Sequence, residues 1–275
     1  AWSRRTLAST DVRDWHVTAT STHMAIADAS GTTRAIYQFQ PGAALPLTSR
    51  ARIESAARGH KYALVMEPGR DGDKVVTSRK GVGRFTLTVK GAASHAGVRH
   101  EDGRSAIAEM ARQIIRIENK TDYARGITCN VGLIQGGTGV NVVPAECKVE
   151  VDLRVPSQQL AEEMTHWFLN LEPIGKDVTL TVEGEMNRPP YQKDAGITSL
   201  FEKAQKIYAE IGKELKDVPL TGGGSDGNFT AALGIPTLDG LGAGGKGAHA
   251  AYEQIYYSSL VPRTYLCTRL LETLE

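Results

Sequence analysis

The stretch Arg84-Phe-Thr-Leu-Thr-Val-Lys90 alternates polar and apolar side chains. This period of two is typical of a strand that buries one face. The turn Ser94-His-Ala-Gly97 comes next, and apolar residues then recur at helical spacing from Ile107 to Ile117, with Asp102 as the expected N-cap. The sequence therefore predicts a strand followed by an amphipathic helix.

The same two patterns continue downstream. Two further strands are expected, then a helix capped by Ser157, then a last strand, over residues 128–135, 147–154, 157–170 and 177–183. The order strand-helix-strand-strand-helix-strand is the ferredoxin-like arrangement. We therefore expect residues 84–186 to form a separate, inserted ferredoxin-like α+β domain.

The segments on either side of this domain have the pattern of an α/β fold. Residues 194–212 place apolar side chains on one helical face, and short apolar runs over 62–66 and 235–238 predict buried strands. A closing helix is expected over 260–274. The predicted fold class is an α/β domain, interrupted by the ferredoxin-like domain, with its two parts at residues 1–83 and 187–275.

Composition limits the kinds of function that are possible. The chain has 275 residues, 41% of them hydrophobic, and its 32 basic and 31 acidic residues give a net charge of +1. This balance provides no general attraction to nucleic acid or to a membrane surface, and no apolar run is long enough to span a bilayer. Three scattered cysteines predict free, buried thiols. A soluble protein is expected, cytoplasmic or periplasmic.

Two residues are candidate metal ligands. Glu67 ends an apolar run and precedes a proline, which predicts a position at the carboxyl edge of an α/β sheet. His249 lies in the glycine-rich stretch from Gly242 to Glu253. Carboxylate and imidazole groups are common zinc ligands. The alternatives are a solvated glutamate and a turn histidine that bonds only to the backbone.

A glycine run, Gly222-Gly-Gly-Ser-Asp226, could leave backbone N–H groups free to hold an anion. It could equally be a packing turn, and as a phosphate loop it lacks the required lysine and spacing. Arg154 and Arg188 offer planar donors for a carboxylate, although an isolated arginine at a strand end is usually just solvated. His95 lies in the inserted domain, so it could reach an α/β site only across a domain or subunit boundary.

Several motifs, in order, resemble one enzyme family. They are Gly-Ala-Ala-Ser-His95, Asn141-Val-Val-Pro, Val151-Asp-Leu-Arg154, Asn187-Arg-Pro, Thr221-Gly-Gly-Gly-Ser-Asp, and Gly247-Ala-His249 followed by Glu253. From about residue 43 to the end, the chain resembles the zinc-dependent aminoacylase and glutamate carboxypeptidase metallopeptidases, relatives of acetylornithine and succinyl-diaminopimelate deacylases. It looks closest to the glutamate carboxypeptidase branch.

The resemblance implies a function and roles for individual residues. Two zinc ions would be bound, with Glu67 on one and His249 on the other. His95 would stabilise the oxyanion in the partner subunit's active site, through a homodimer formed by the ferredoxin-like lids. The substrate would be a small peptide or N-acyl amino acid, cleaved next to a free carboxylate such as a C-terminal glutamate. The residues implied to hold this substrate are Asn141, Arg154, Arg188, Gly222, Gly223 and Gly224.

Residues 1–42 depart from the family pattern. The family's His-x-Asp pair, bridging Asp and Glu-Glu pair are not identifiable, and Gln38 to Ala44 occupy the place of the Glu-Glu pair. His16, His23 and Asp28 do not match either. Glutamine cannot serve as the general base. We therefore expect a fragment of the fold, incomplete at its N-terminus and inactive as written; the alternative is a non-catalytic carboxylate-binding or dimerisation module.

Overall fold

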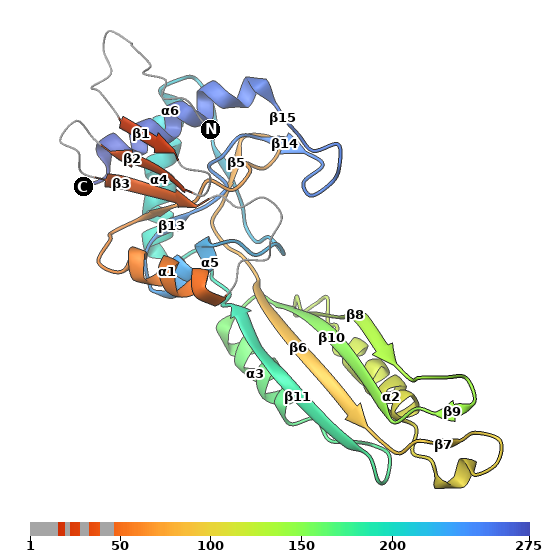
Figure 1. The fold of residues 1–275 in the computed structure, drawn as a ribbon. Helices are drawn as coiled ribbons and strands as arrows, with labels where there is room; N and C mark the ends of the chain where they lie inside the picture. Colours follow the sequence, from red (N-terminus) through yellow and green to blue (C-terminus); the bar gives the residue numbers. More distant parts are fainter. Residues whose placement is uncertain (1–15, 20–22, 28–32, 39–46) are drawn as a thin grey trace.

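A computed structural model describes residues 16–19, 23–27, 33–38 and 47–275, with side chains described from Arg50 onward. Figure 1 shows two units placed end to end. One, which we call the sheet unit, comprises residues 81–188, and the other, the α/β unit, contains the described residues up to 76 and from 195 onward. Residues 77–80 and 189–194 connect them and are called here the outgoing and return linkers.

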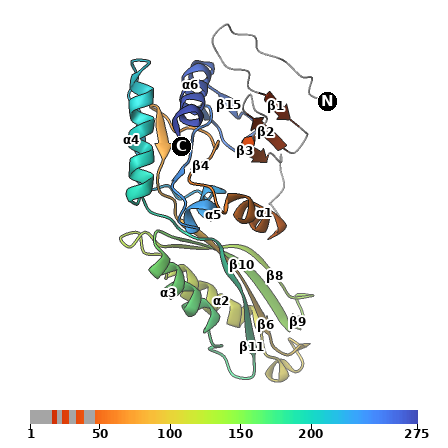
Figure 2. The same ribbon diagram turned by 90° about the vertical axis from the view of Figure 1, so that its left-hand side faces the viewer.

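The sheet unit has the predicted order of elements. Its strands are β6 (Gly81–Lys90), β8 (Thr128–Gly136), β10 (Glu146–Val155) and β11 (Thr179–Arg188), arranged β11-β6-β10-β8 with every pair antiparallel. Helices α2 (Ala106–Glu118) and α3 (Gln158–Leu169) lie on one face of this sheet, as Figure 2 shows.

The alternation seen in the sequence determines which face the helices cover. Phe85, Leu87 and Val89 of β6 point into the core, and Phe85 stacks on Phe168 of α3 with the ring centroids 4.3 Å apart. Each such side chain stabilises the fold by roughly 1.5–3 kcal/mol through burial. The core residues of β10 lie on the same face: Cys147, Val149, Val151, Leu153 and Val155.

One predicted helix cap is confirmed and one is wrong. Ser157 caps α3 by accepting a hydrogen bond from Leu160 N at 3.4 Å. For α2, however, the cap is Ser105, whose Oγ accepts from Ala108 N at 3.1 Å. Asp102 instead lies in a separate 3₁₀ turn, because Arg104 forms a β-bridge with Ala92 before the helix begins.

The α/β unit contains two parallel strand pairs: β4 (Ala63–Leu64) with β13 (Thr237–Leu238), and β5 (Lys74–Val76) with β12 (Lys216–Val218). A hairpin, β14 (Gly245–Lys246) and β15 (Gln254–Ile255), extends from it. Its helices are α1 (Leu47–Ala57), α4 (Ala195–Ala209), α5 (Gly227–Ala232) and α6 (Tyr257–Thr273). The predicted apolar face of α4 is buried through Ile197, Leu200, Phe201, Ala204, Ile207 and Tyr208.

Near the N-terminus, β1 (His16–Ala19), β2 (His23–Ala27) and β3 (Thr33–Gln38) form an antiparallel sheet in the order β1-β2-β3. Pairing with a neighbouring strand can impose strand structure where the sequence has no clear period of its own. Asp28, and the residues after Gln38 in the place of the Glu-Glu pair, lie outside the described residues. None of the helices in the described part of the chain is long and apolar enough to cross a membrane.

Candidate functional site

The glycine loop, which we define as residues 221–226, is held by three arginines through its carbonyl groups. Arg154 Nη1 donates to Gly222 O at 3.1 Å, Arg79 Nη1 to Gly223 O at 2.8 Å, and Arg188 Nε to Ser225 O at 3.2 Å. In a trans peptide the N–H points opposite to the C=O. The amides that follow these carbonyls therefore point away from the arginines, and backbone amides of this kind are the groups that bind anions in proteins.

Two of the glycines in this loop have different roles. A Cβ on Gly224 would lie 2.8 Å from Val82 Cγ2 and 2.9 Å from Arg188 Cδ, so close packing requires glycine there. A Cβ on Gly222 would meet nothing within 4 Å. The packing-turn interpretation thus applies to Gly224, while Gly222 borders open space, as an anion cradle requires.

Beneath the loop lies a buried ion pair that the sequence analysis did not identify. Arg79 binds Asp239 through two bonds, Nε to Oδ2 at 2.7 Å and Nη2 to Oδ1 at 2.9 Å, and their side chains are 3% and 0% exposed. Ser225 Oγ also donates to Asp239 Oδ2, and Gly240 N to Oδ1 at 2.5 Å. The sequence did contain a clue to Asp239, because this acid directly follows the short run predicted as a buried strand, which becomes β13.

Glu67 lies just beyond the carboxyl end of the parallel β4–β13 pair, where Gly242 N donates to Glu67 O at 2.9 Å. This is the predicted kind of position. Desolvation raises the pKa of the partly exposed Glu67 carboxyl, the Asp239 carboxylate raises it further, and the Arg79 guanidinium opposes them. Glu67 is therefore an acid in the electrostatic field of the ion pair beneath the glycine loop.

His249 lies in the exposed loop between β14 and β15, and its backbone φ is +65°. Few non-glycine residues adopt this left-handed conformation, and those that do are often at functional sites. The His249 amide donates to Glu253 Oε2 at 3.3 Å. This backbone bond fits the turn-histidine interpretation, and the exposed ring also agrees with a ligand role.

A complete metal centre does not follow from these residues. Among the side chains that the structure describes, no three His, Cys, Asp or Glu residues lie together in a way that could hold a metal ion. A catalytic zinc site takes about three protein ligands and a structural one about four. Glu67 and His249 alone therefore do not fit the two-ion site that the resemblance implies.

His95 and Asn141 lie together at the far end of the sheet unit. His95 is in β7 (Ser94–His95), which pairs with β9 (Val142–Val143), and Ala96 N donates to Asn141 O at 2.9 Å. Figure 1 shows this pair at the end opposite the α/β unit. The ten residues of β6 between the two ends span about 33 Å. Within one chain, His95 and Asn141 therefore do not join the group around the glycine loop.

The two arginines that were predicted to donate hydrogen bonds to a substrate carboxylate are both paired with acidic side chains of the chain itself. Arg154 bonds Asp152 through Nε at 2.6 Å and Nη2 at 2.9 Å, while Arg188 Nη2 lies 3.4 Å from Asp226 Oδ1. Burial raises the pKa of Asp226, and Arg188 opposes this. Neither arginine is simply solvated, and both contact the glycine loop. Arg70, missed from sequence, also lies nearby, with Nη2 4.0 Å from the position that a Gly223 Cβ would occupy.

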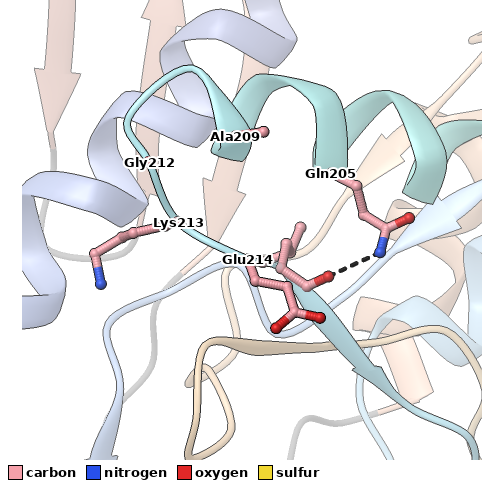
Figure 3. Close-up of a pocket in the computed structure, with 6 residues that line it drawn as sticks. Gln205, Ala209, Gly212, Lys213 and Glu214 are labelled. Carbon is pink, nitrogen blue, oxygen red and sulfur yellow. Dashed lines mark hydrogen bonds between the residues drawn. The ribbon is translucent and has the colours of Figure 1, made fainter.

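Two other features of the chain, the cysteines and a surface hollow, are not part of the candidate functional site. All three cysteines are free and buried, as expected, and burial raises the pKa of Cys129 and Cys267 to about 12, so these thiols stay protonated. An open hollow at the end of α4, shown in Figure 3, contains none of the predicted site residues. It is lined by Gln205, Ala209, Gly212, Lys213, Glu214 and Leu215.

Comparisons with known proteins agree with this architecture. Residues 77–171 match the peptidase dimerisation domain family. The chain is 29% identical to carboxypeptidase G2 from a Pseudomonas species over 230 residues, covering 81% of this chain and 55% of that protein. It is 30% identical to succinyl-diaminopimelate desuccinylase from Bordetella avium over 232 residues, covering 79% and 59%. The chain thus spans little more than half the length of these relatives.

Solved structures show the same fold. Aminopeptidase PepT from Bacillus cereus superposes with a TM-score of 0.68 at 19% identity, covering 94% of this chain and 76% of that one. The YXEP protein from Bacillus subtilis, described as a dinuclear metal-binding peptidase from the M20 family, gives 0.61 at 17% identity, covering 79% and 58%.

Proposed function

Because the chain is homologous to the metallopeptidase family of carboxypeptidase G2 and succinyl-diaminopimelate desuccinylase, we propose that it is a hydrolase of the carboxypeptidase or amidohydrolase type. Its substrate would carry a free carboxylate beside the cleaved amide bond, as in a small peptide or an N-acyl-glutamate. The homology supports the reaction class, and the glycine loop supports the carboxylate.

The observation that carries this proposal is the arrangement of the three arginines around the glycine loop. They hold the carbonyls of Gly222, Gly223 and Ser225, so the amides that follow these carbonyls, at Gly223, Gly224 and Asp226, point away from the arginines. A carboxylate accepts hydrogen bonds from such amides, and charge-assisted bonds are the stronger ones. Arg154 and Arg188 lie beside the loop, each paired with an acid, Asp152 and Asp226 respectively.

We further propose Glu67 and His249 as metal ligands, with zinc as the metal. Two ligands do not complete a site, so we assign the described residues a binding role and no metal-dependent step. Zinc titration by calorimetry separates the candidate functions. About two tight sites per chain would support an enzyme whose remaining ligands lie outside the described side chains. No binding would favour the alternative, a carboxylate-binding or dimerisation module.

A homodimer through the sheet unit is the third part of the proposal. The outer strand β8 ends the sheet, and two of its apolar side chains, Leu133 and Ile134, are 63% and 60% exposed. An exposed apolar edge strand favours association with another chain. Such a dimer would give His95 access to the partner's glycine loop, which its own chain does not allow.

The reaction itself is tested with N-acyl-glutamates and added zinc. Because no general base is identifiable, we expect little release of glutamate by the chain as written. Rapid release that a chelator stops would contradict this expectation of inactivity. Binding is tested separately: N-acetyl-L-glutamate should bind, and the analogue with both carboxylates converted to amides should not. Equal binding of the two compounds would overturn the carboxylate-binding proposal.

A further inference from the structure

The two linkers are bonded directly to each other. Arg79 N donates to Tyr191 O and Tyr191 N to Arg79 O, both at 3.1 Å, and Ser78 Oγ donates to Tyr191 O at 3.0 Å. The chain therefore leaves and re-enters the α/β unit through one short β-bridge. Any change in the angle between the two units has to act on this bridge.

The glycine loop is bonded to the outgoing linker directly, and to the return linker through Asn228 of α5, whose Oδ1 accepts from Ser225 N at 2.9 Å. Lys80 N donates to Thr221 O at 2.9 Å, and Thr221 N to Ser78 O at 3.2 Å. On the other side of the loop, Asn228 Nδ2 donates to Lys80 O at 3.2 Å and to Pro189 O at 2.8 Å. The loop is thus part of the connection between the units.

The Arg79 side chain connects these parts at a single buried point. It belongs to the outgoing linker, its Nε and Nη2 are fixed by Asp239 of the α/β unit, and its Nη1 holds Gly223 O. A planar guanidinium can serve two acceptors in fixed directions, whereas the ammonium of lysine is a point charge. The orientation of the Gly223–Gly224 peptide therefore depends on Arg79 itself, not only on a positive charge at that place.

We propose that Arg79 is a positioning residue for carboxylate binding, which sets the glycine loop amides relative to both linkers. This inference rests on the proposed function, because it assigns a ligand to the loop. Asp239 aligns Arg79, and Ser225 reinforces the arrangement, since its Oγ donates to Asp239 and accepts from Gly227 N at 3.0 Å. Arg79 is enclosed beneath the loop and acts on the ligand only through the loop backbone.

The test uses two variants of the full chain and measures N-acetyl-L-glutamate binding by calorimetry. Arg79→Lys retains the charge and loses the fixed directions. The double variant Arg79→Met with Asp239→Asn removes the charged pair together, so that no buried charge is left uncompensated and folding is retained. For both, we expect the dissociation constant to rise at least tenfold. A dissociation constant within twofold of the parent in the folded double variant would overturn the proposal.

A matched control separates positioning from simple loss of stability. Glu109 is a buried, hydrogen-bonded carboxylate in the sheet unit, so Glu109→Gln also disturbs a buried polar group but leaves the glycine loop intact. Its dissociation constant should stay within twofold of the parent. If Glu109→Gln lost binding to the same extent, the effect of the Arg79 variants would be explained by general destabilisation. This result would contradict the proposal that Arg79 positions the glycine loop.

A second readout does not need the ligand. Ser225 N donates to Asn228 Oδ1 at 2.9 Å, so the amides of Ser225 and Gly227 should be protected from hydrogen exchange. In the double variant these two amides should exchange at least tenfold faster than in the parent. In Glu109→Gln their exchange rates should equal those of the parent. If the parent binds no N-acetyl-L-glutamate, the proposed ligand is wrong, while faster exchange still supports positioning of the loop. Unchanged exchange in the double variant would refute it.

Discussion

The sheet unit and the junction below it are stabilised in different ways. In the sheet unit, apolar side chains of the strands and of α2 and α3 fill one continuous core. At the junction, the buried polar groups include Ser78, Arg79, Ser225 and Asp239, which bond to each other and to the backbone. An apolar core tolerates changes of similar volume, whereas a buried polar network is destabilised when one member loses its partner. The junction is therefore where single substitutions should have the largest effects.

The largest effect is expected for Arg79→Met alone. It leaves the Asp239 carboxylate buried without its partner, which costs about 3–5 kcal/mol. Adding Asp239→Asn should restore most of the lost stability. Urea unfolding of the parent, the single and the double variant measures this. A double variant no more stable than the single one would contradict a paired network.

The next largest effect concerns the corresponding carboxylate in the sheet unit, Glu109. Its oxygens accept from Ile174 N and Gly175 N, both at 2.8 Å, and from Gln113 Nε2 at 2.8 Å. Glu109→Ala leaves these buried donors without an acceptor, so we expect a loss of about 1–3 kcal/mol at neutral pH. Urea unfolding at pH 7 measures it. If Glu109→Ala lowered the free energy of unfolding as much as Arg79→Met does, the sheet unit and the junction would not differ in the way described.

The same carboxylate should make stability depend on pH. Burial alone would raise the pKa of Glu109, but hydrogen bonds from Ile174, Gln113, Gly175 and Arg112 outweigh it and lower the pKa below the usual 4.5. A depressed pKa in the folded state gives stability that is present above the unfolded pKa and lost as pH falls through the folded one. The difference in the free energy of unfolding between the parent and Glu109→Ala should therefore shrink as the pH falls below 4.5. A constant difference down to pH 3 would contradict this sign.

A smaller effect is expected on association through the edge of the sheet unit. Leu133→Lys places a charge on the exposed edge of β8, opposite Glu150 of β10, so the chain itself should stay folded. The dimer should dissociate at least tenfold more readily, equivalent to about 1.4 kcal/mol. Sedimentation velocity measures it. Thr181→Lys on the opposite edge strand, β11, is the matched control and should leave the dimer unchanged.

The smallest effect on stability is expected at His249. Its left-handed φ of +65° suits glycine, so His249→Gly should change the free energy of unfolding by less than about 1 kcal/mol. Zinc binding, if His249 is a ligand, should weaken at least tenfold. A substantial loss of stability together with unchanged zinc binding would show that His249 has a structural role instead.

Much of the fold could be predicted because it follows from local patterns. The alternation over residues 84–90 and the cap at Ser157 lead directly to β6 and α3. The cap of α2 was missed because the bridge between Ala92 and Arg104 is a contact between segments, which no local pattern reveals. The domain limits at residues 84 and 186 stay predictions, while the strands that flank the linkers begin at Gly81 and end at Arg188.

The site could be predicted only in part. Motifs with glycine, arginine and histidine identified Arg154, Arg188 and the Gly222–Gly224 run, which do lie together. They could not identify Arg79 and Asp239, because a buried ion pair between positions 160 residues apart has no periodic signal. The roles proposed for Glu67, His249, His95 and Asn141 stay predictions, since they depend on a metal and on a second subunit.

The most direct test of the account is a titration of the isotope-labelled chain with N-acetyl-L-glutamate, followed through its backbone amide signals by NMR. We predict that the largest shifts occur at Gly223, Gly224 and Asp226, whose amides follow the arginine-held carbonyls. Signals from β7 and β9 should shift little in a monomeric sample. Saturable shifts confined to other parts of the chain, with the glycine loop unchanged, would contradict carboxylate binding at this loop.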